Sequence, residues 1–265
     1  MQKNYSRIIL GATSAGLGAF FSDPEETLLM EASSMVGTDF ATSFYPGSAS
    51  ANQYDGKPQN IIFEEAIKIG VLKNGLVHLP GLHTLIYKHL TPFVQNCLLL
   101  TEFLSCETID GKIAVTVFNK NGTTIYTCDE LIDATPTLVT NQIKTEIISA
   151  SLGSVFVSTK DDAVLPTLKN GKIFATCFPN EFYFHIPLTR EDSWSNARNN
   201  LIRFVIENEE AFEGWSLAAT AVEKKLKISD KYKGHASVLN SSEFDGIVEG
   251  FNGGIQFINN RKALV

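Results

Sequence analysis

Hydrophobic and polar positions follow different periods along the chain, and this outlines the secondary structure. Near the N-terminus, a short apolar strand over Arg7–Leu10 runs directly into a glycine-containing turn, Gly11–Gly16. A helical stretch over 17–21 follows and stops at Asp23-Pro24, because a residue before proline is kept out of the helical region. The segment Thr27–Met30 predicts a second strand. Together these segments predict a strand-turn-helix-strand unit with parallel strands.

The middle of the chain predicts a long loop, two helices and a group of strands. Residues 32–59 are rich in Ser, Gly, Asn and Pro, so we expect an extended loop of the kind that wraps around a ligand. Apolar residues at helical spacing predict helices over 61–72 and 80–94. Two strong hairpin signals, Asp110-Gly111 and Asn121-Gly122, join predicted strands. These strands cover 97–106, 112–119 and 123–127, and a further short strand covers 131–135.

After residue 140 the pattern becomes antiparallel. Strands are predicted over 154–158, 172–178 and 181–187, and helices over 194–212 and 217–228. An amphipathic run then ends at Ile258. The whole order of elements predicts an α/β fold whose parallel part comes first.

Composition and charge exclude several classes of protein. Of the 265 residues, 44% are hydrophobic and 19% charged, a globular balance. A net charge of −7 without a basic cluster gives no reason to expect nucleic acid or an anionic membrane as a partner. The cysteines lack the spacing of metal ligands, so we expect reduced thiols and no metal. Lys3 and the apolar run 8–21 have the outline of a signal peptide, but we expect a cytoplasmic protein.

The glycine turn carries the clearest chemistry. A helix that starts there directs backbone N–H groups and the positive end of its dipole at a phosphate. Gly11 permits the tight turn and Gly16 permits close helix–strand packing, while Thr13 stands where the usual fingerprint has a further glycine. Glu31 ends the second strand, where an acid accepts hydrogen bonds from a ribose diol. The spacing predicts a dinucleotide site; a turn that needs no ligand is the alternative.

The segment Arg7–Gly18 resembles the N-terminus of FAD-dependent oxidoreductases of the glutathione-reductase-like, two-dinucleotide-fold class. Strands 112–127 resemble the β-meander of that class, and 131–135 resembles its second FAD motif, with Pro136 in place of a glycine. The segment 242–254 is similar to the last FAD segment, where a helix N-terminus faces the flavin. The cofactor-binding residues that the resemblance implies are Gly11, Thr13, Ser14, Ala15, Gly16, Glu31, Ala32, Gly37, Thr38, Leu104, Ala134, Thr135, Asp245 and Gly246.

This resemblance also implies a fold and a reaction. The fold is a Rossmann-like FAD-binding domain with a β-meander, over residues 1–140 and completed by 236–265. An inserted antiparallel-sheet substrate domain covers residues 141–235. The implied activity is an FAD-dependent oxidoreductase in which a hydride passes from a small-molecule substrate to flavin N5.

Catalytic residues are harder to assign. Strand alternation places Tyr183 and His185 on one face, where they could meet a substrate, and Arg190 could hold a carboxylate. Aromatic strands usually belong to the core, however, so a structural role is the stronger interpretation. The catalytic residue therefore stays unassigned.

Two other functions stay open. Pro136, the short first helix and the lack of a clear acid–base group fit a protein that kept the fold without the cofactor, as a scaffold or subunit. An NAD(P)-dependent dehydrogenase would share the glycine turn but leaves the meander and the 131–135 segment unexplained. The sequence is compatible with a homo-oligomer or with a partner subunit.

Overall fold

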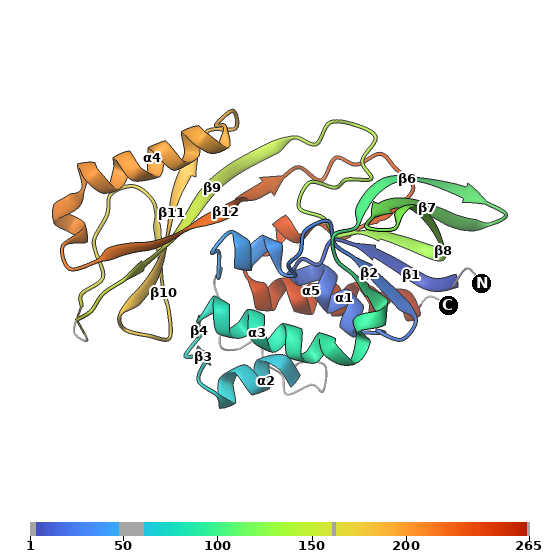
Figure 1. Ribbon diagram of the computed structural model, residues 1–265, viewed down its shortest axis with the longest axis horizontal. Helices are drawn as coiled ribbons and strands as arrows, with labels where there is room; N and C mark the ends of the chain where they lie inside the picture. The colour runs from blue at the N-terminus through green and yellow to red at the C-terminus, as the bar shows by residue number, and fades with distance from the viewer. Residues whose placement is uncertain (1–3, 48–60, 161–162, 264–265) are drawn as a thin grey trace.

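A computed structural model describes residues 4–47, 61–160 and 163–263. Its larger sheet is mixed and lies beside a second, antiparallel sheet (Figure 1). In spatial order the larger sheet contains β5 (Cys97–Leu98), β2 (Thr27–Met30), β1 (Asn4–Leu10), β8 (Gly122–Asp133), β7 (Lys112–Asn119) and β6 (Glu102–Ile109), with β13 (Ser237–Val238) also paired to β8. The α/β fold with a parallel part is therefore confirmed.

Strand β8 joins the parallel part of this sheet to the meander. Its first half pairs antiparallel with β7, and its second half pairs parallel with β1. The predicted separate strands over 123–127 and 131–135 are therefore wrong, because they form one continuous strand. Since β1 also pairs parallel with β2, the carboxyl ends of β1, β2 and β8 lie at one edge of the sheet. Both predicted hairpins of the meander are confirmed.

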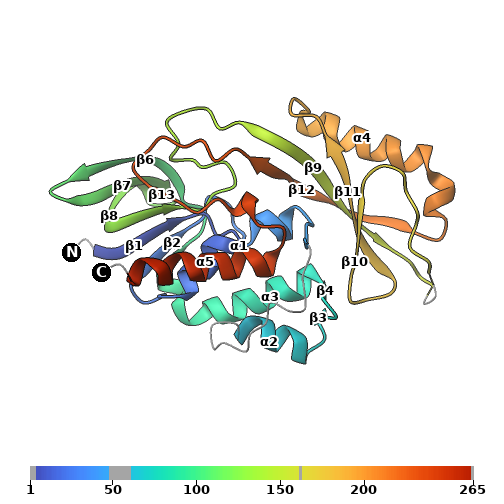
Figure 2. The same ribbon diagram turned by 180° about the vertical axis from the view of Figure 1, so that it is seen from behind.

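Four helices cover one face of the larger sheet (Figures 1 and 2). They are α1 (Ser14–Phe21), α2 (Ile61–Lys68), α3 (Leu79–Leu90) and α5 (Ile247–Lys262). Helices α1 and α5 meet backbone to backbone, because a Cβ on Gly18 would lie 1.9 Å from the Phe251 carbonyl oxygen. The opposite face buries a smaller core that includes Tyr5, Ile8 and Val115.

The second sheet has the order β10 (Lys172–Ala175), β11 (Glu181–Leu188), β9 (Ile147–Val157) and β12 (Ser216–Ile228). Helix α4 (Trp194–Glu207) packs on it over an aromatic core that includes Phe156, Phe182 and Phe184. Strands β9 and β12 are long and extend toward the larger sheet (Figure 1).

Several predicted helices differ from the structure, and the one over 194–212 ends at Glu207, before a 3-10 turn over Glu209–Phe212. The predicted helix over 217–228 is wrong, because these residues form strand β12. Ala, Leu, Lys and Glu favour helix locally, but pairing with β9 overrides that preference, with register shifts along the strand. The predicted helix over 61–72 ends at Lys68, because β3 (Leu72–Lys73) and β4 (Leu76–Val77) form a small hairpin.

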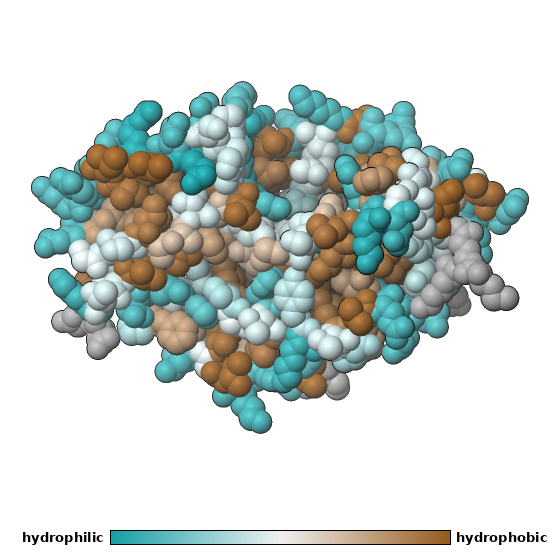
Figure 3. All heavy atoms as spheres, viewed as in Figure 1, coloured by the Kyte–Doolittle hydropathy of each residue, from teal (hydrophilic) through white to brown (hydrophobic). Residues whose placement is uncertain are grey.

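The predicted long loop is only partly described. After β2 the chain passes through a π-helical turn, η1 (Thr38–Thr42), and Gly47 then forms a bridge with Gly246. Residues 48–59 of this loop lie outside the described residues. On the face shown in Figure 3, hydrophobic and hydrophilic side chains are interspersed over both sheets. Among the described residues, no helix is long and apolar enough to span a bilayer.

Candidate functional site

The glycine turn is held in shape by its own chain. Gly11 has φ +91°, and a Cβ there would lie 2.8 Å from the Thr135 backbone. Thr13 caps α1, since its Oγ1 accepts from Gly16 N at 3.2 Å and donates to the Ala134 carbonyl at 2.9 Å. Thr13 therefore ties the turn to the end of β8, which a glycine at this position could not do.

Glu31 lies at the carboxyl end of β2 and faces the turn. Its Oε2 accepts from Ala12 N at 2.9 Å and its Oε1 from Ser33 N at 2.8 Å. A carboxylate oxygen can accept two hydrogen bonds, so each keeps an acceptor position beyond this contact. The side chain is placed where the sequence predicts a ribose-binding acid.

A second carboxylate, Asp39, occupies the N-terminus of α1. Its Oδ1 accepts from Ser14 N at 2.8 Å, and its Oδ2 accepts from Ser14 Oγ at 2.6 Å. The Asp39 residue is only 8% exposed. Sequence reasoning missed this residue, although it directly follows the predicted Gly37-Thr38 pair.

A third carboxylate, Asp133, organises the loop after β8. It is fully buried and accepts four hydrogen bonds. The donors are the backbone N–H and hydroxyl groups of Thr135 and Thr140, at 2.6–3.0 Å. These hydrogen bonds to Asp133 fix the conformation of the loop that contains Ala134, Thr135 and Pro136. Proline stands in this loop in place of the motif's glycine.

Three cavities follow the carboxyl edge of the parallel strands. The central cavity, about 470 Å³, lies between this edge and β12, and Glu31, Thr38 and Thr135 line it. A cavity of about 540 Å³ lies toward the meander and shares Ala32 with the central one. A cavity of about 250 Å³ lies before α5 and shares Leu226 with the central one. Each neighbouring pair of cavities thus shares one lining residue, and we refer to the three together as the series.

Charges of both signs line this series, and several of them act on one another. Burial raises the pKa of the Glu223 carboxyl, and the charges of Glu31 and Asp39 raise it further, against a hydrogen bond from Thr42. Burial lowers the pKa of Lys225, and the charges of Asp39 and Asp245 oppose this shift. Four carboxyl groups and one buried lysine thus interact across the site.

Of Asp245, Gly246 and Leu104, which were also predicted to bind the cofactor, only Asp245 lines a cavity of the series. Asp245 accepts from the Tyr45 hydroxyl at 2.8 Å and lines the cavity before α5, where Gly246 caps the helix. Leu104 lies in a register shift of β6 and is 49% exposed. Its neighbour Glu102 lines the cavity beside the meander, whereas Leu104 does not. The predicted contact of Leu104 with adenine stays a prediction.

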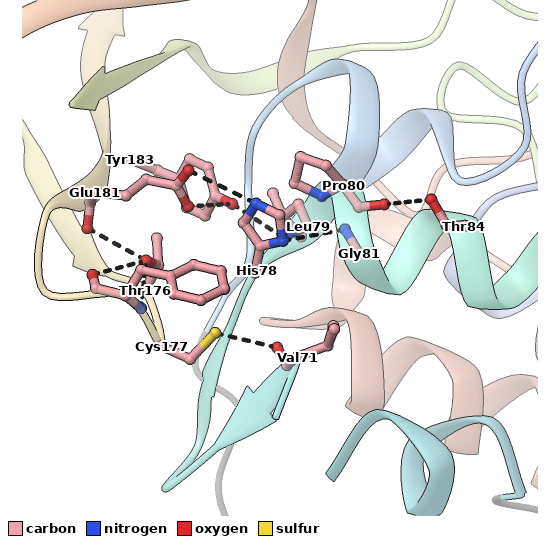
Figure 4. A network of polar contacts seen from close by, with 11 residues as sticks. Val71, His78, Leu79, Pro80, Gly81, Thr84, Thr176, Cys177, Glu181 and Tyr183 are labelled. Atoms are coloured by element: carbon pink, nitrogen blue, oxygen red, sulfur yellow. Dashed lines mark hydrogen bonds and ion pairs between the residues drawn. The ribbon is translucent and has the colours of Figure 1, made fainter. Parts of the chain in front are cut away.

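Tyr183 belongs to a polar network between the antiparallel sheet and the start of α3. Its hydroxyl accepts from Leu79 N at 2.9 Å and donates to Glu181 Oε1 at 3.3 Å. Figure 4 shows Tyr183 and Glu181 pointing toward His78 and Leu79 at the start of α3. Burial, then the charge of Glu181, raises the pKa of this hydroxyl. The described contacts give Tyr183 a connecting role, away from the three cavities.

His185 is buried beside it on β11. Its Nε2–H donates to the Phe44 carbonyl at 2.9 Å, so Nδ1 accepts from Ser151 Oγ at 3.0 Å. Burial lowers the pKa of His185 to about 4. Arg190 pairs at the surface with Glu146 at 3.5 Å. Any catalytic role of these three residues stays a prediction, and they do not line the series of cavities.

Cysteine and histidine chemistry adds little to the site. Within residues 4–47, 61–160 and 163–263, no cluster of metal-ligating side chains is suited to a metal ion. The four cysteines are unpaired, and burial raises the pKa of Cys97 to about 11 and that of Cys128 to about 12. Buried thiols of this kind are poor nucleophiles.

Comparison with solved structures identifies the architecture. The crystal structure of p-nitrophenol 4-monooxygenase PnpA from Pseudomonas putida DLL-E4 matches with a TM-score of 0.66 and 9% identity, over 100% of this chain and 81% of that chain. Aklavinone-11 hydroxylase, solved in a ternary complex with FAD and aklavinone, matches with a TM-score of 0.67 and 11% identity, over 100% and 63%. The fold is similar to that of FAD-binding flavoproteins.

A third neighbour supports the same conclusion. The myxobacterial chondrochloren halogenase CndH, a variant of FAD-dependent halogenases, matches with a TM-score of 0.64 and 10% identity, over 98% of this chain and 76% of that chain. The sequence itself matches no protein-family model and no curated protein. At these identities the likeness establishes the fold alone, and the narrower glutathione-reductase-like class stays a prediction.

Proposed function

We propose that this chain is an FAD-binding oxidoreductase of the two-dinucleotide-fold, glutathione-reductase-like class. The observation that carries the proposal is the central cavity at the carboxyl edge of β1, β2 and β8, with a neighbouring cavity on either side that shares a lining residue with it. Ligands of open α/β sheets bind outside this edge. An extended dinucleotide suits hollows that run from the meander, past Glu31, to the N-terminus of α5.

The residues along the series fit the parts of FAD in order. Ala32 and the meander cavity receive adenine, and the spare acceptor positions of Glu31 receive ribose hydroxyls. Ser14 and Thr38 lie beside the diphosphate position, although Asp39 holds Ser14 in this conformation. Thr135 and the start of α5 lie toward the flavin. When bound, FAD supplies a hydride acceptor at N5.

The cavity before α5 suits a small-molecule substrate. Tyr45, Ser151, Lys225 and Asp245 line it, so it offers hydroxyl, ammonium and carboxylate groups for orientation. Strands β9 and β12 form one wall of this cavity. In this proposal residues 1–140 and 236–265 bind the cofactor, while 141–235 carry the substrate side.

Visible absorbance of the purified chain, before and after incubation with FAD and desalting, tests the proposal. We expect flavin bands to be retained after incubation. Glu31→Gln should weaken FAD binding roughly tenfold, since a charged acceptor of the ribose is lost. Glu26→Gln, at an exposed position just before the opposite end of β2, is the matched control and should bind as the wild type does. A chain that stays colourless in every case contradicts the proposal.

A second candidate function rests on Asp39. Because its carboxylate already fills the N-terminus of α1, the chain also fits a flavoprotein fold that works without a cofactor, as a scaffold or subunit. Thermal unfolding that responds to neither FAD nor NAD(P) would favour this function. NAD(P) as the cofactor ranks below FAD, because the compared structures described with a cofactor are described with FAD.

A further inference from the structure

Asp39 is a charged group near the carboxyl edge of the parallel strands, and the proposed arrangement of FAD gives it no binding role. Its two carboxylate oxygens accept from the backbone N–H and the hydroxyl of Ser14, the first residue of α1. A helix N-terminus attracts anions through its dipole and its unpaired N–H groups. The carboxylate therefore takes the place that the phosphate of a dinucleotide would take.

The segment that presents Asp39 is built into the fold. Gly37, with φ +69°, donates its N–H to the Ala12 carbonyl at 2.5 Å. Ser43 Oγ donates to the Asp39 carbonyl at 2.8 Å. Upstream, the N–H of Val36 donates to the Tyr87 hydroxyl on α3. Asp39 is thus positioned by an anchored turn.

Acidic groups close to Asp39 disfavour adding a diphosphate while its carboxylate stays in place. The charges of Glu31 and Asp39 both act on Glu223, and the charge of Asp39 also acts on the buried Lys225. A diphosphate brings two further negative charges toward these carboxylates. Such charges repel more strongly in a partly buried site than in water.

We propose that the Asp39 carboxylate and the diphosphate of FAD compete for Ser14, so that Asp39 sets the affinity of the chain for its cofactor. This inference rests on the proposed function. It assigns to Asp39 the role of an internal anion, which the turn Gly37–Ser43 must withdraw before the diphosphate reaches α1.

Binding titrations with FAD, ADP and adenosine test this inference. Asp39→Asn removes the charge and keeps the shape, and Asp39→Ala removes both. We expect both variants to bind FAD and ADP roughly tenfold to a hundredfold more tightly than the wild type, the size of one charge-assisted hydrogen bond. Adenosine lacks the diphosphate, so its affinity should not change.

Asp23→Asn is the matched control. Asp23 follows the opposite end of α1, where it pairs with Arg7 and Lys262 at 3.1 Å. This variant changes the net charge by the same amount, yet its affinities should equal those of the wild type. Far-ultraviolet circular dichroism establishes that each variant is folded. If Asp39→Ala does not fold, Asp39→Asn decides the question.

The outcomes separate the two proposals. Tighter binding of FAD and ADP by the Asp39 variants, with adenosine unchanged, supports the competition. Equal FAD binding by wild type and Asp39 variants overturns it and leaves the proposed function intact. Weaker binding by the variants, or an equal gain for adenosine, also overturns it. If no variant binds FAD, both proposals fail.

Discussion

The carboxyl edge of the parallel strands and the antiparallel sheet both bury polar groups, but in different settings. At the edge, Glu31 and Asp133 accept hydrogen bonds from Ser33 and Thr135, which line the central cavity, and Asp39 accepts from Ser14 at the start of α1. In the antiparallel sheet, Tyr183 and His185 bond to segments of other elements and lie outside the cavity lining. A buried polar side chain is therefore a guide to function only when the segment it orders borders a cavity.

Removal of the Asp133 carboxylate should have the largest effect on stability. Asp133→Ala leaves four donors without their acceptor, two of them buried and two partly buried, and we expect the free energy of unfolding to fall by about 4 kcal/mol. Chemical denaturation measures this change. Asp129→Ala, which removes an exposed ion pair with Lys112, is the control and should change stability by less than about 1 kcal/mol. Equal losses for the two variants would contradict the ordering role of Asp133.

Packing of the helix that carries the glycine turn gives the next largest effect. Gly18→Ala places a Cβ 1.9 Å from the Phe251 carbonyl oxygen, so α1 and α5 must separate. We expect a loss of about 3 kcal/mol in the free energy of unfolding. Gly122→Ala, in a meander turn with φ +84° and open space around it, should lose only about 1 kcal/mol. Thermal unfolding of both variants provides the measurement, and equal losses would speak against the close helix contact.

In the antiparallel sheet, His185 should make the stability of the chain depend on pH. Its pKa is about 4 in the folded chain, below the ordinary value of 6.5, so the unfolded chain takes up the proton first. The stabilisation is complete above pH 6.5 and is lost as the pH falls toward about 4, a change of roughly 2–3 kcal/mol. Denaturation across this range should show the slope, and His185→Gln should remove the contribution of this residue to it. The slope should persist in His235→Gln, at an exposed position.

Tyr183 gives the smallest effect. Tyr183→Phe removes the acceptor of Leu79 N and the donor to Glu181, and we expect a loss of about 1 kcal/mol in the free energy of unfolding. Chemical denaturation is the measurement. No loss at all would show that the network in Figure 4 does not stabilise the contact between α3 and the antiparallel sheet.

Local patterns were sufficient for much of the fold. The turn at Gly11–Gly16, strand β2 and the meander hairpins follow from apolar runs and turn residues, and the structure has them. Strand β12 could not be predicted this way, because its helix-favouring residues are paired with β9, far away in the sequence. Tertiary pairing decided that segment.

The candidate site shows the same division. Glu31 was predictable, because strand end and spacing place it. Asp39 was not, since nothing local shows which polar residue of a long loop turns back onto Ser14. Asp133 lay within a quoted motif, but its four donors come from residues whose contacts only the folded loop reveals.

The most direct test of the account is the visible spectrum of wild-type and Asp39→Asn protein after incubation with FAD and desalting. We expect the Asp39→Asn protein to retain one flavin per chain and the wild type to retain less. Protein that is folded yet colourless in both forms would contradict it.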